Sequence, residues 1–256
     1  MLLLNWHKAL SLFLFITPHV LLGVLAVILY KRRLYREFPC FFAYVLYEIA
    51  KFIPLFALYT VLGATSKPYA YAYCATLMIS IALRFGVIEE VSKDLFRESQ
   101  FLKAAARRSL QCVTGSLVGI GVLLAVCAPG DSRFGFVSNI LVVNRGAAMV
   151  QSGLLLALLL FSRFLGLSWR RSTFGIALGV GILTSVDLAM FALRAEFASA
   201  VAAVYLDLLI TGTYLVCVSV WIRYSLAPEL EPASLTVVSR DEVETWNTEL
   251  QHLLRD

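Results

Sequence analysis

Charged residues are scarce in this sequence, and their scarcity excludes a soluble protein. Only 15% of the 256 residues are Asp, Glu, Lys or Arg, while 60% are hydrophobic. Soluble domains average about 25% charged and about 45–50% apolar residues. The composition therefore predicts an integral membrane protein, whose partner is the lipid bilayer. The net charge of +5 then reports on topology and gives no reason to expect nucleic-acid binding.

Histidine is scarcer still, which removes much of metal and haem chemistry. His7, His19 and His252 are too few and too scattered to hold a catalytic zinc or a pair of haem axial ligands. Glu89 and Glu90 resemble the paired glutamates of intramembrane CAAX-type proteases, but those enzymes need histidines on later helices, which are absent here. The sequence also lacks a phosphate-binding glycine loop and a GxSxG elbow. We therefore expect a non-enzymatic protein without a cofactor or metal.

The five cysteines include no CxxC pair, and all lie within or beside apolar runs. Free cysteine is a common small core residue, so packing explains most of them. Cys74 and Cys127 both fall toward the predicted outer side. Whether these two form a disulfide stays open at this point.

Long apolar runs are what the sequence has in abundance, and a membrane-spanning helix needs about 20 such residues. The predicted spans are residues 9–30, 38–62, 69–106, 109–128, 136–165, 173–194 and 198–224. The third contains no glycine or proline after its apolar part, so we expect it to project from the membrane by several turns. Residues 1–227 thus form an all-α, seven-transmembrane-helix bundle, followed by a polar tail over 228–256.

Lys and Arg are distributed unevenly over the connections between these spans. Thirteen follow the first, third, fifth and seventh spans, and only four lie in the connections on the other side. Basic residues accumulate in cytoplasmic loops. The pattern predicts an N-terminus outside, a C-terminus in the cytoplasm and a multi-pass protein of the bacterial cytoplasmic (inner) membrane.

Two charges in the middle of the second span, Glu48 and Lys51, are its most unusual feature. A charge at bilayer depth costs roughly 3 kcal/mol on insertion scales, so it must face a partner or water. The two residues are three apart and share a helix face. Counting depth along each span adds further polar residues at similar levels. The predicted buried polar cluster or candidate pocket comprises His19, Glu48, Lys51, Arg84, Asn144, Arg145, Gln151, Asp187, Asp207 and Tyr214.

The charges of this predicted cluster balance, which leaves two interpretations. Three bases and three acids at similar depth favour mutual pairing, because an unpaired buried ion is strongly unfavourable. In the first interpretation the pairs only fix the order of the helices. In the second they line an outward-facing polar pocket or an ion path. The predicted core of the cluster is Glu48, Lys51, Arg145, Asp187 and Asp207.

Two GxxxG motifs predict close helix contacts. Gly115 and Gly119 form one, and Gly175 and Gly179 form the other, with Gly181 two residues beyond. Small residues at this spacing let helix backbones approach each other. We expect packing within the bundle rather than dimerisation.

The tail contains a predicted amphipathic helix over residues 240–255. Its apolar positions follow helical spacing: Val243, Trp246, Leu250, Leu253 and Leu254. This face either packs on the protein itself or on the membrane surface, or it docks a cytoplasmic or membrane protein partner or a second copy of the chain.

The segments LLLNWHKALSLFLF and YREFPCFFAYVLYE resemble an uncharacterised group of small bacterial seven-helix membrane proteins. The resemblance covers mainly the first two helices and implies no activity. From the buried charges we expect a receptor-like or sensory module that responds to a small ligand or a proton. The alternatives are a secondary transporter or proton-coupled channel, and a structural subunit of a larger membrane complex.

Overall fold

The computed structural model is entirely helical in the part of the chain that it describes. That part comprises residues 2–63, 66–97, 135–164, 169–196 and 200–227, with isolated positions between 108 and 119. The elements are α1 (Leu2–Lys31), the 3-10 turn η1 (Leu34–Arg36), α2 (Pro39–Leu62), α3 (Lys67–Leu95), α5 (Gly135–Phe164), α6 (Arg171–Glu196) and α7 (Ala200–Leu226). The predicted all-α class is confirmed for these residues. The predicted span 109–128 and the tail from residue 228 lie outside them.

Five of the helices are long and apolar enough to cross a membrane. These stretches are Pro39–Leu62, Lys67–Leu95, Val142–Phe164, Arg171–Met190 and Leu208–Leu226. Their lengths match the roughly 20 residues that a span needs. The chain is therefore a multi-pass membrane protein, as its composition predicts.

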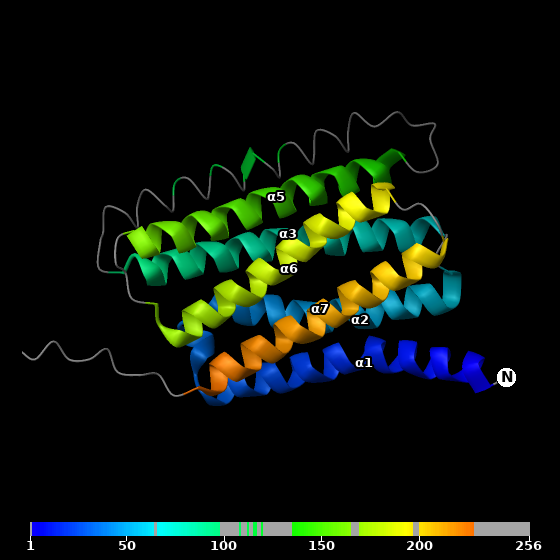
Figure 1. Cartoon of the computed structure of the whole chain (residues 1–256), viewed down its shortest axis with the longest axis horizontal. Coiled ribbons are helices and arrows are strands. Elements are labelled where there is room, and N and C mark those ends of the chain that lie inside the picture. Colours follow the sequence, from blue (N-terminus) through cyan, green and yellow to red (C-terminus); the bar gives the residue numbers. More distant parts are fainter. Residues whose placement is uncertain are drawn as a thin grey trace, which may run out of the picture.

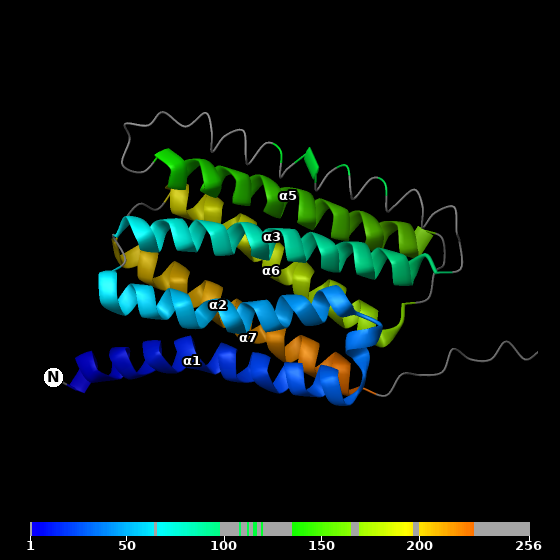
Figure 2. The same cartoon turned by 180° about the vertical axis from the view of Figure 1, so that it is seen from behind.

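The helices form a closed ring in the order α1, α2, α3, α5, α6, α7, with α7 returning to α1. A further contact between α3 and α6 crosses the ring. In Figures 1 and 2, α1 and α5 lie at opposite edges, and α6 and α7 cross over one side of α2 and α3. This arrangement places α3 next to α2, α5 and α6.

One end of the bundle collects the charged connections. Here α1, α3, α5 and α7 end, and α2 and α6 begin (Figures 1 and 2). We call it the charged end, after Arg32, Glu37, Asp94 and Arg170. The guanidinium of Arg32 donates to the carbonyl oxygen of Ala227 at 3.4 Å, which joins the end of α1 to the end of α7.

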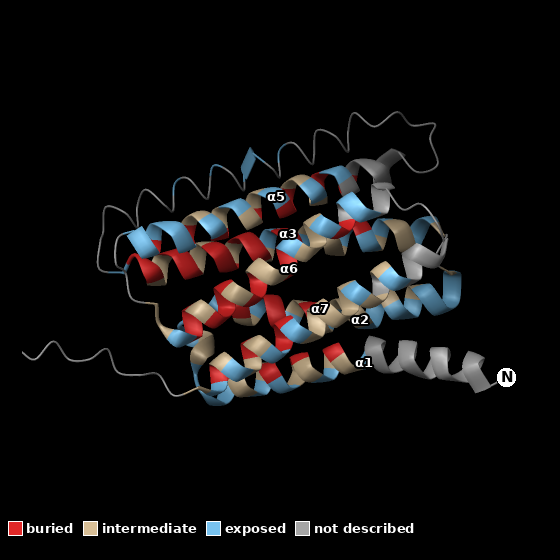
Figure 3. Cartoon of the chain, viewed as in Figure 1, coloured by how far each residue is buried: buried red, intermediate tan, exposed pale blue. Residues whose placement is uncertain are grey.

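The hydrophobic core lies toward the charged end, where the buried residues gather in Figure 3. At its centre is Trp221 of α7, which is 0% exposed. Its indole makes edge-on contacts with the rings of Phe41 and Tyr44 on α2, with centroids 5.3 Å and 6.1 Å away. Such edge-to-face geometry is preferred because it matches the charge distribution of aromatic rings.

Two glycines bring α6 against α7. A Cβ at Gly175 would overlap Tyr224, and one at Gly179 would overlap Trp221. This confirms that the second GxxxG motif packs within the bundle. A Cβ at Gly115 or Gly119 would meet no described atom within 4 Å, so the packing predicted for the first motif is not seen against the described residues.

The third helix ends earlier than the predicted span over residues 69–106. Instead of continuing to residue 106, α3 ends at Leu95, and Phe96 caps it with a backbone N–H bond to the carbonyl of Ser92 at 3.0 Å. Both Leu95 and Phe96 are buried in the main core. Burying two large apolar side chains stabilises a turn at this point more than a solvated helix would.

Candidate functional site

The buried face of α2 carries Glu48 into the interior. Phe41, Tyr44, Val45 and Glu48 recur at helical spacing and are the buried residues of this helix. The three apolar members pack in the core, so the carboxylate follows them into the bundle. Glu48 is only 8% exposed and must find its partners inside the protein.

Three helices supply those partners. The ammonium of Lys51 donates to Oε1 of Glu48 at 2.7 Å, and the hydroxyl of Ser80 on α3 donates to the same oxygen at 2.9 Å. Lys51 also donates to the Ser80 hydroxyl oxygen at 2.9 Å. The phenol of Tyr214 on α7 donates to Oε2 at 3.5 Å. The carboxylate therefore ties α2 to both α3 and α7.

A second ion pair lies one turn further along α3. Arg84 Nη1 donates to Oδ2 of Asp187 on α6 at 2.9 Å, and Arg84 is 7% exposed. Ser80 and Arg84 lie four residues apart on α3, so the two pairs are neighbours along this helix. We call this group the ionic network: Glu48, Lys51, Ser80, Arg84, Asp187 and Tyr214. It joins α2, α3, α6 and α7 at mid-bundle.

The other predicted members lie apart from the ionic network or cannot be placed. Gln151 is buried and donates to the carbonyl of Ile81 at 3.2 Å, which fixes α5 to α3. The ring of His19 contacts the ring of Phe52 in a tilted arrangement, with centroids 4.0 Å apart, and Asn144 is half-buried. The side chain of Asp207 lies outside the described residues.

The placement of Arg145 in the buried cluster is wrong. Arg145 is exposed on α5, on the same face as the exposed residues Val142, Met149 and Leu156. The buried face of α5 carries small apolar residues such as Ala148 in place of Arg145. Depth along a helix does not determine which way a side chain points, and that angle decides the contact.

A second polar group at the charged end was missed by reasoning from the sequence. Glu90 of α3 accepts from the backbone N–H groups of Cys40 and Phe41 at 3.1 Å and 3.0 Å, and so caps the start of α2. The first N–H groups of a helix lack partners within it, and a carboxylate is favoured there. One signal in the sequence could have indicated this cap. The N-cap residue of α2 is Phe38, whose side chain makes no hydrogen bond to the first turn of the helix.

Three chain connections meet at Arg170, also at the charged end. Its guanidinium pairs with Glu37 before α2 at 3.0 Å and with Asp94 of α3 at 3.5 Å. Thr173 of α6 donates a short hydrogen bond to the Asp94 carboxylate. We call Glu37, Asp94, Arg170 and Thr173 the loop junction. It connects the end of α3 with the starts of α2 and α6.

The capping role of Glu90 predicts that replacing Glu90 lowers the stability of the protein more than replacing its neighbour Glu89. Glu90→Ala leaves two N–H groups without an acceptor, and losing a helix cap costs about 1–2 kcal/mol. Glu89→Ala is the matched control, because Glu89 makes an i,i+4 pair with the half-exposed Lys93 at 2.8 Å, and such pairs contribute about 0.3–0.5 kcal/mol. Unfolding of both variants by SDS titration in micelles measures the difference. Equal losses would contradict the capping role.

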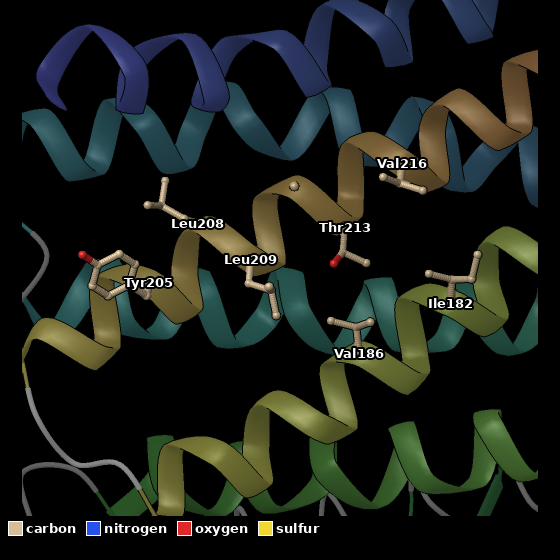
Figure 4. Close-up of a pocket in the computed structure, with 8 residues that line it drawn as sticks. Ile182, Val186, Tyr205, Leu208, Leu209, Thr213 and Val216 are labelled. Carbon is tan, nitrogen blue, oxygen red and sulfur yellow. The ribbon is translucent and has the colours of Figure 1, made fainter. Parts of the chain in front are cut away.

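An apolar groove lies between α6 and α7 and has a volume of about 540 Å³ (Figure 4). It is lined by Ile182, Val186, Tyr205, Leu208, Leu209, Gly212, Thr213 and Val216. This lining includes no member of the predicted polar cluster. The groove therefore differs in chemistry from the polar pocket that the sequence leads one to expect.

The remaining predictions concern single residues. Cys74 is a buried, free thiol on α3, and Cys127 lies outside the described part of the chain. No group of three or more His, Cys, Asp or Glu residues that could hold a metal occurs among the described residues. The five apolar residues proposed for partner docking belong to the tail beyond residue 227 and lie outside the described ranges.

No known protein family, curated protein or solved structure matches the chain. Its function must therefore be argued from the ionic network, the loop junction and the groove.

Proposed function

We propose that this chain is a non-enzymatic, receptor-like module of the bacterial cytoplasmic membrane. The ionic network would be its switch and the loop junction its output. The observation that carries the proposal is that one helix, α3, contributes to both. Ser80 and Arg84 belong to the network, and Glu90 and Asp94 hold the charged end.

A rigid helix transmits displacement along its length. Ser80 and Asp94 are separated by about 21 Å at about 1.5 Å per residue. A shift of α3 that rearranges Ser80 and Arg84 would therefore also move the cap on α2 and the acceptor of Arg170. Interfaces of this kind change between discrete arrangements rather than deforming gradually.

The charges of the ionic network are paired, but not all of its hydrogen-bond donors have an acceptor. This supports the existence of a second arrangement of the same side chains. Arg84 makes one bond to Asp187, and its Nε is buried without a hydrogen-bond partner among the described residues. The Tyr214 bond to Glu48 is long, at 3.5 Å. Because unsatisfied buried donors are costly, a competing arrangement that satisfies Arg84 would be close in free energy.

Two further observations support a seven-span topology with the charged end in the cytoplasm. Helices α3 and α5 run in the same direction (Figures 1 and 2), as expected if the predicted span 109–128 separates them. The basic connections gather at the charged end, as the positive-inside rule requires of the cytoplasmic side. The loop junction would then face cytoplasmic partners.

The proposal predicts that a change in the network alters hydrogen exchange at the charged end. Glu48→Gln removes the charge without changing the shape, which weakens the bonds from Lys51 and Ser80. We expect faster backbone exchange in residues 37–41 and 90–97, measured by mass spectrometry in nanodiscs, with no change near residues 60–70. Ser219→Ala is the control, because that exposed hydroxyl bonds only to its own helix, at 2.8 Å. Exchange that rises equally at both ends would indicate general loosening and contradict the proposal.

Transport is the second candidate, and partial exposure of the network favours it. The side chains of Lys51 and Asp187 are 23% and 21% exposed, so each ion pair has one member open to its surroundings. A proton-coupled transporter would show flux in proteoliposomes that Glu48→Gln abolishes. A receptor-like module would show no flux in either protein.

A further inference from the structure

The apolar groove between α6 and α7 is a binding feature that the ionic network does not explain. Tyr205 and Thr213 supply the only side-chain polar atoms of its lining, and none of its eight residues is charged. A charged solute or a polar peptide would find no partner there. The chemistry of the lining fits a hydrocarbon.

The groove opens to the side of the bundle rather than to its ends. Both of its walls belong to helices that are long and apolar enough to cross a membrane. Its lining residues Tyr205, Leu209 and Val216 are exposed on the surface of the protein. At this depth the surrounding medium is lipid hydrocarbon, so an occupant would enter from the bilayer.

The length and cross-section of the groove match those of one hydrocarbon chain. From Tyr205 to Val216 it spans about 16 Å of α7, which is close to the roughly 15 Å of one hydrocarbon leaflet. Dividing its volume of about 540 Å³ by this length leaves a cross-section of about 34 Å². That area is close to the cross-section of one hydrocarbon chain and smaller than that of a whole helix, which is at least about 10 Å across.

The volume of the groove also matches that of one long hydrocarbon chain. At about 30 Å³ for each water-sized group, the groove holds on the order of eighteen groups, similar to the methylenes of one long acyl chain. Gly212 contributes to the hollow, because a Cβ there would meet nothing within 4 Å. Figure 4 shows Leu209, Thr213 and Val186 projecting between the two helices that form the walls.

We propose that this groove binds one acyl chain of a membrane lipid, and that its occupancy is the signal to which the ionic network responds. The second part rests on the proposed function. Val186 in the groove precedes Asp187 of the network, and Thr213 precedes Tyr214. An occupant that moves α6 relative to α7 therefore displaces two members of the network directly.

Photo-crosslinking tests the site. The full chain is reconstituted in nanodiscs of phosphatidylcholine that carries a diazirine in one acyl chain, and crosslinks are mapped by mass spectrometry. We expect labelling concentrated on residues 182–186 and 205–216. Gly212→Leu fills the groove and lowers this labelling roughly tenfold, the change that a loss of about 1.4 kcal/mol in binding free energy produces.

Gly153→Leu is the matched control, because a Cβ at Gly153 also meets no described atom within 4 Å, but this glycine is exposed and lies on α5. Groove labelling should persist in this variant. Labelling spread evenly over the apolar surface would contradict the site, as would a dimer whose interface occupies the groove.

Hydrogen exchange then tests the coupling separately. In Gly212→Leu we expect changed exchange at residues 90–97, and none in Gly153→Leu. If labelling falls without a change in exchange, the acyl site stands and the coupling is wrong. If Glu48→Gln changes this exchange while Gly212→Leu keeps its labelling, the proposed function stands and the acyl site is wrong.

Discussion

Replacing Asp187 with leucine should lower the free energy of unfolding by about 3–5 kcal/mol, the largest loss expected for any single polar residue of the bundle. Asp187 is the only carboxylate paired with Arg84 among the described residues, and Arg84 is 7% exposed. Removing one partner of a buried ion pair leaves the other charge uncompensated. Among the described residues, the Arg84 Nε has no hydrogen-bond partner even with Asp187 in place, so the loss of Asp187 adds to an existing deficit.

The double variant Arg84→Met, Asp187→Leu separates the cost of an unpaired charge from the value of the pair. A buried pair replaced by apolar side chains of similar size is often neutral in stability. We therefore expect the double variant to recover most of the lost free energy, as measured by SDS titration in mixed micelles. Additive losses from Arg84→Met and Asp187→Leu would show that the two side chains do not depend on each other, and would contradict the pairing.

The ion pair of Glu48 and Lys51 could be predicted from the sequence because both residues belong to one helix. Their spacing of three fixes their relative direction, and the structure joins them at 2.7 Å. The pair of Arg84 and Asp187 was predicted only as two members of a balanced set. Which acid meets which base depends on the order and rotation of the helices, and neither is determined by depth.

The errors have the same origin. Arg145 was predicted from its depth along the chain, but its side chain points outward, because α5 is buried along Ala147, Ala148 and Gln151 instead. The end of α3 was missed because Leu95 and Phe96 bury against residues distant in sequence. The cap supplied by Glu90 to α2 crosses fifty residues of chain. Local patterns carry no information about such partners.

The expected polar pocket and the observed apolar groove differ for a related reason. One interpretation of the buried charges predicts that they line the pocket that a ligand enters. In the structure, buried charges such as Arg84 and Asp187 pair with one another. The groove is a separate feature, lined by Val186 and Thr213. A membrane protein can thus pair charges in its interior while a groove on its surface is lined by apolar side chains.

Gly179→Ala should destabilise the bundle by about 1–3 kcal/mol or more, because a single added methyl group overpacks its core. A Cβ at this position would overlap the indole ring of Trp221. That ring cannot move away, since it is 0% exposed and held between Phe41 and Tyr44 on its other side. Helices α6 and α7 would have to separate, and the shift would extend to the groove that they share.

Gly181→Ala provides the comparison within the same helix. Its Cβ would lie 3.9 Å from Cδ1 of Leu155, an ordinary contact, and alanine is favoured over glycine in a helix by about 1 kcal/mol. We therefore expect this variant to be neutral or slightly stabilised in the same SDS titration. The double variant Gly179→Ala, Trp221→Phe should regain part of the loss, because the smaller ring leaves room for the methyl group. If both glycine variants unfold alike, the close approach of α6 to Trp221 is not what holds these two helices together.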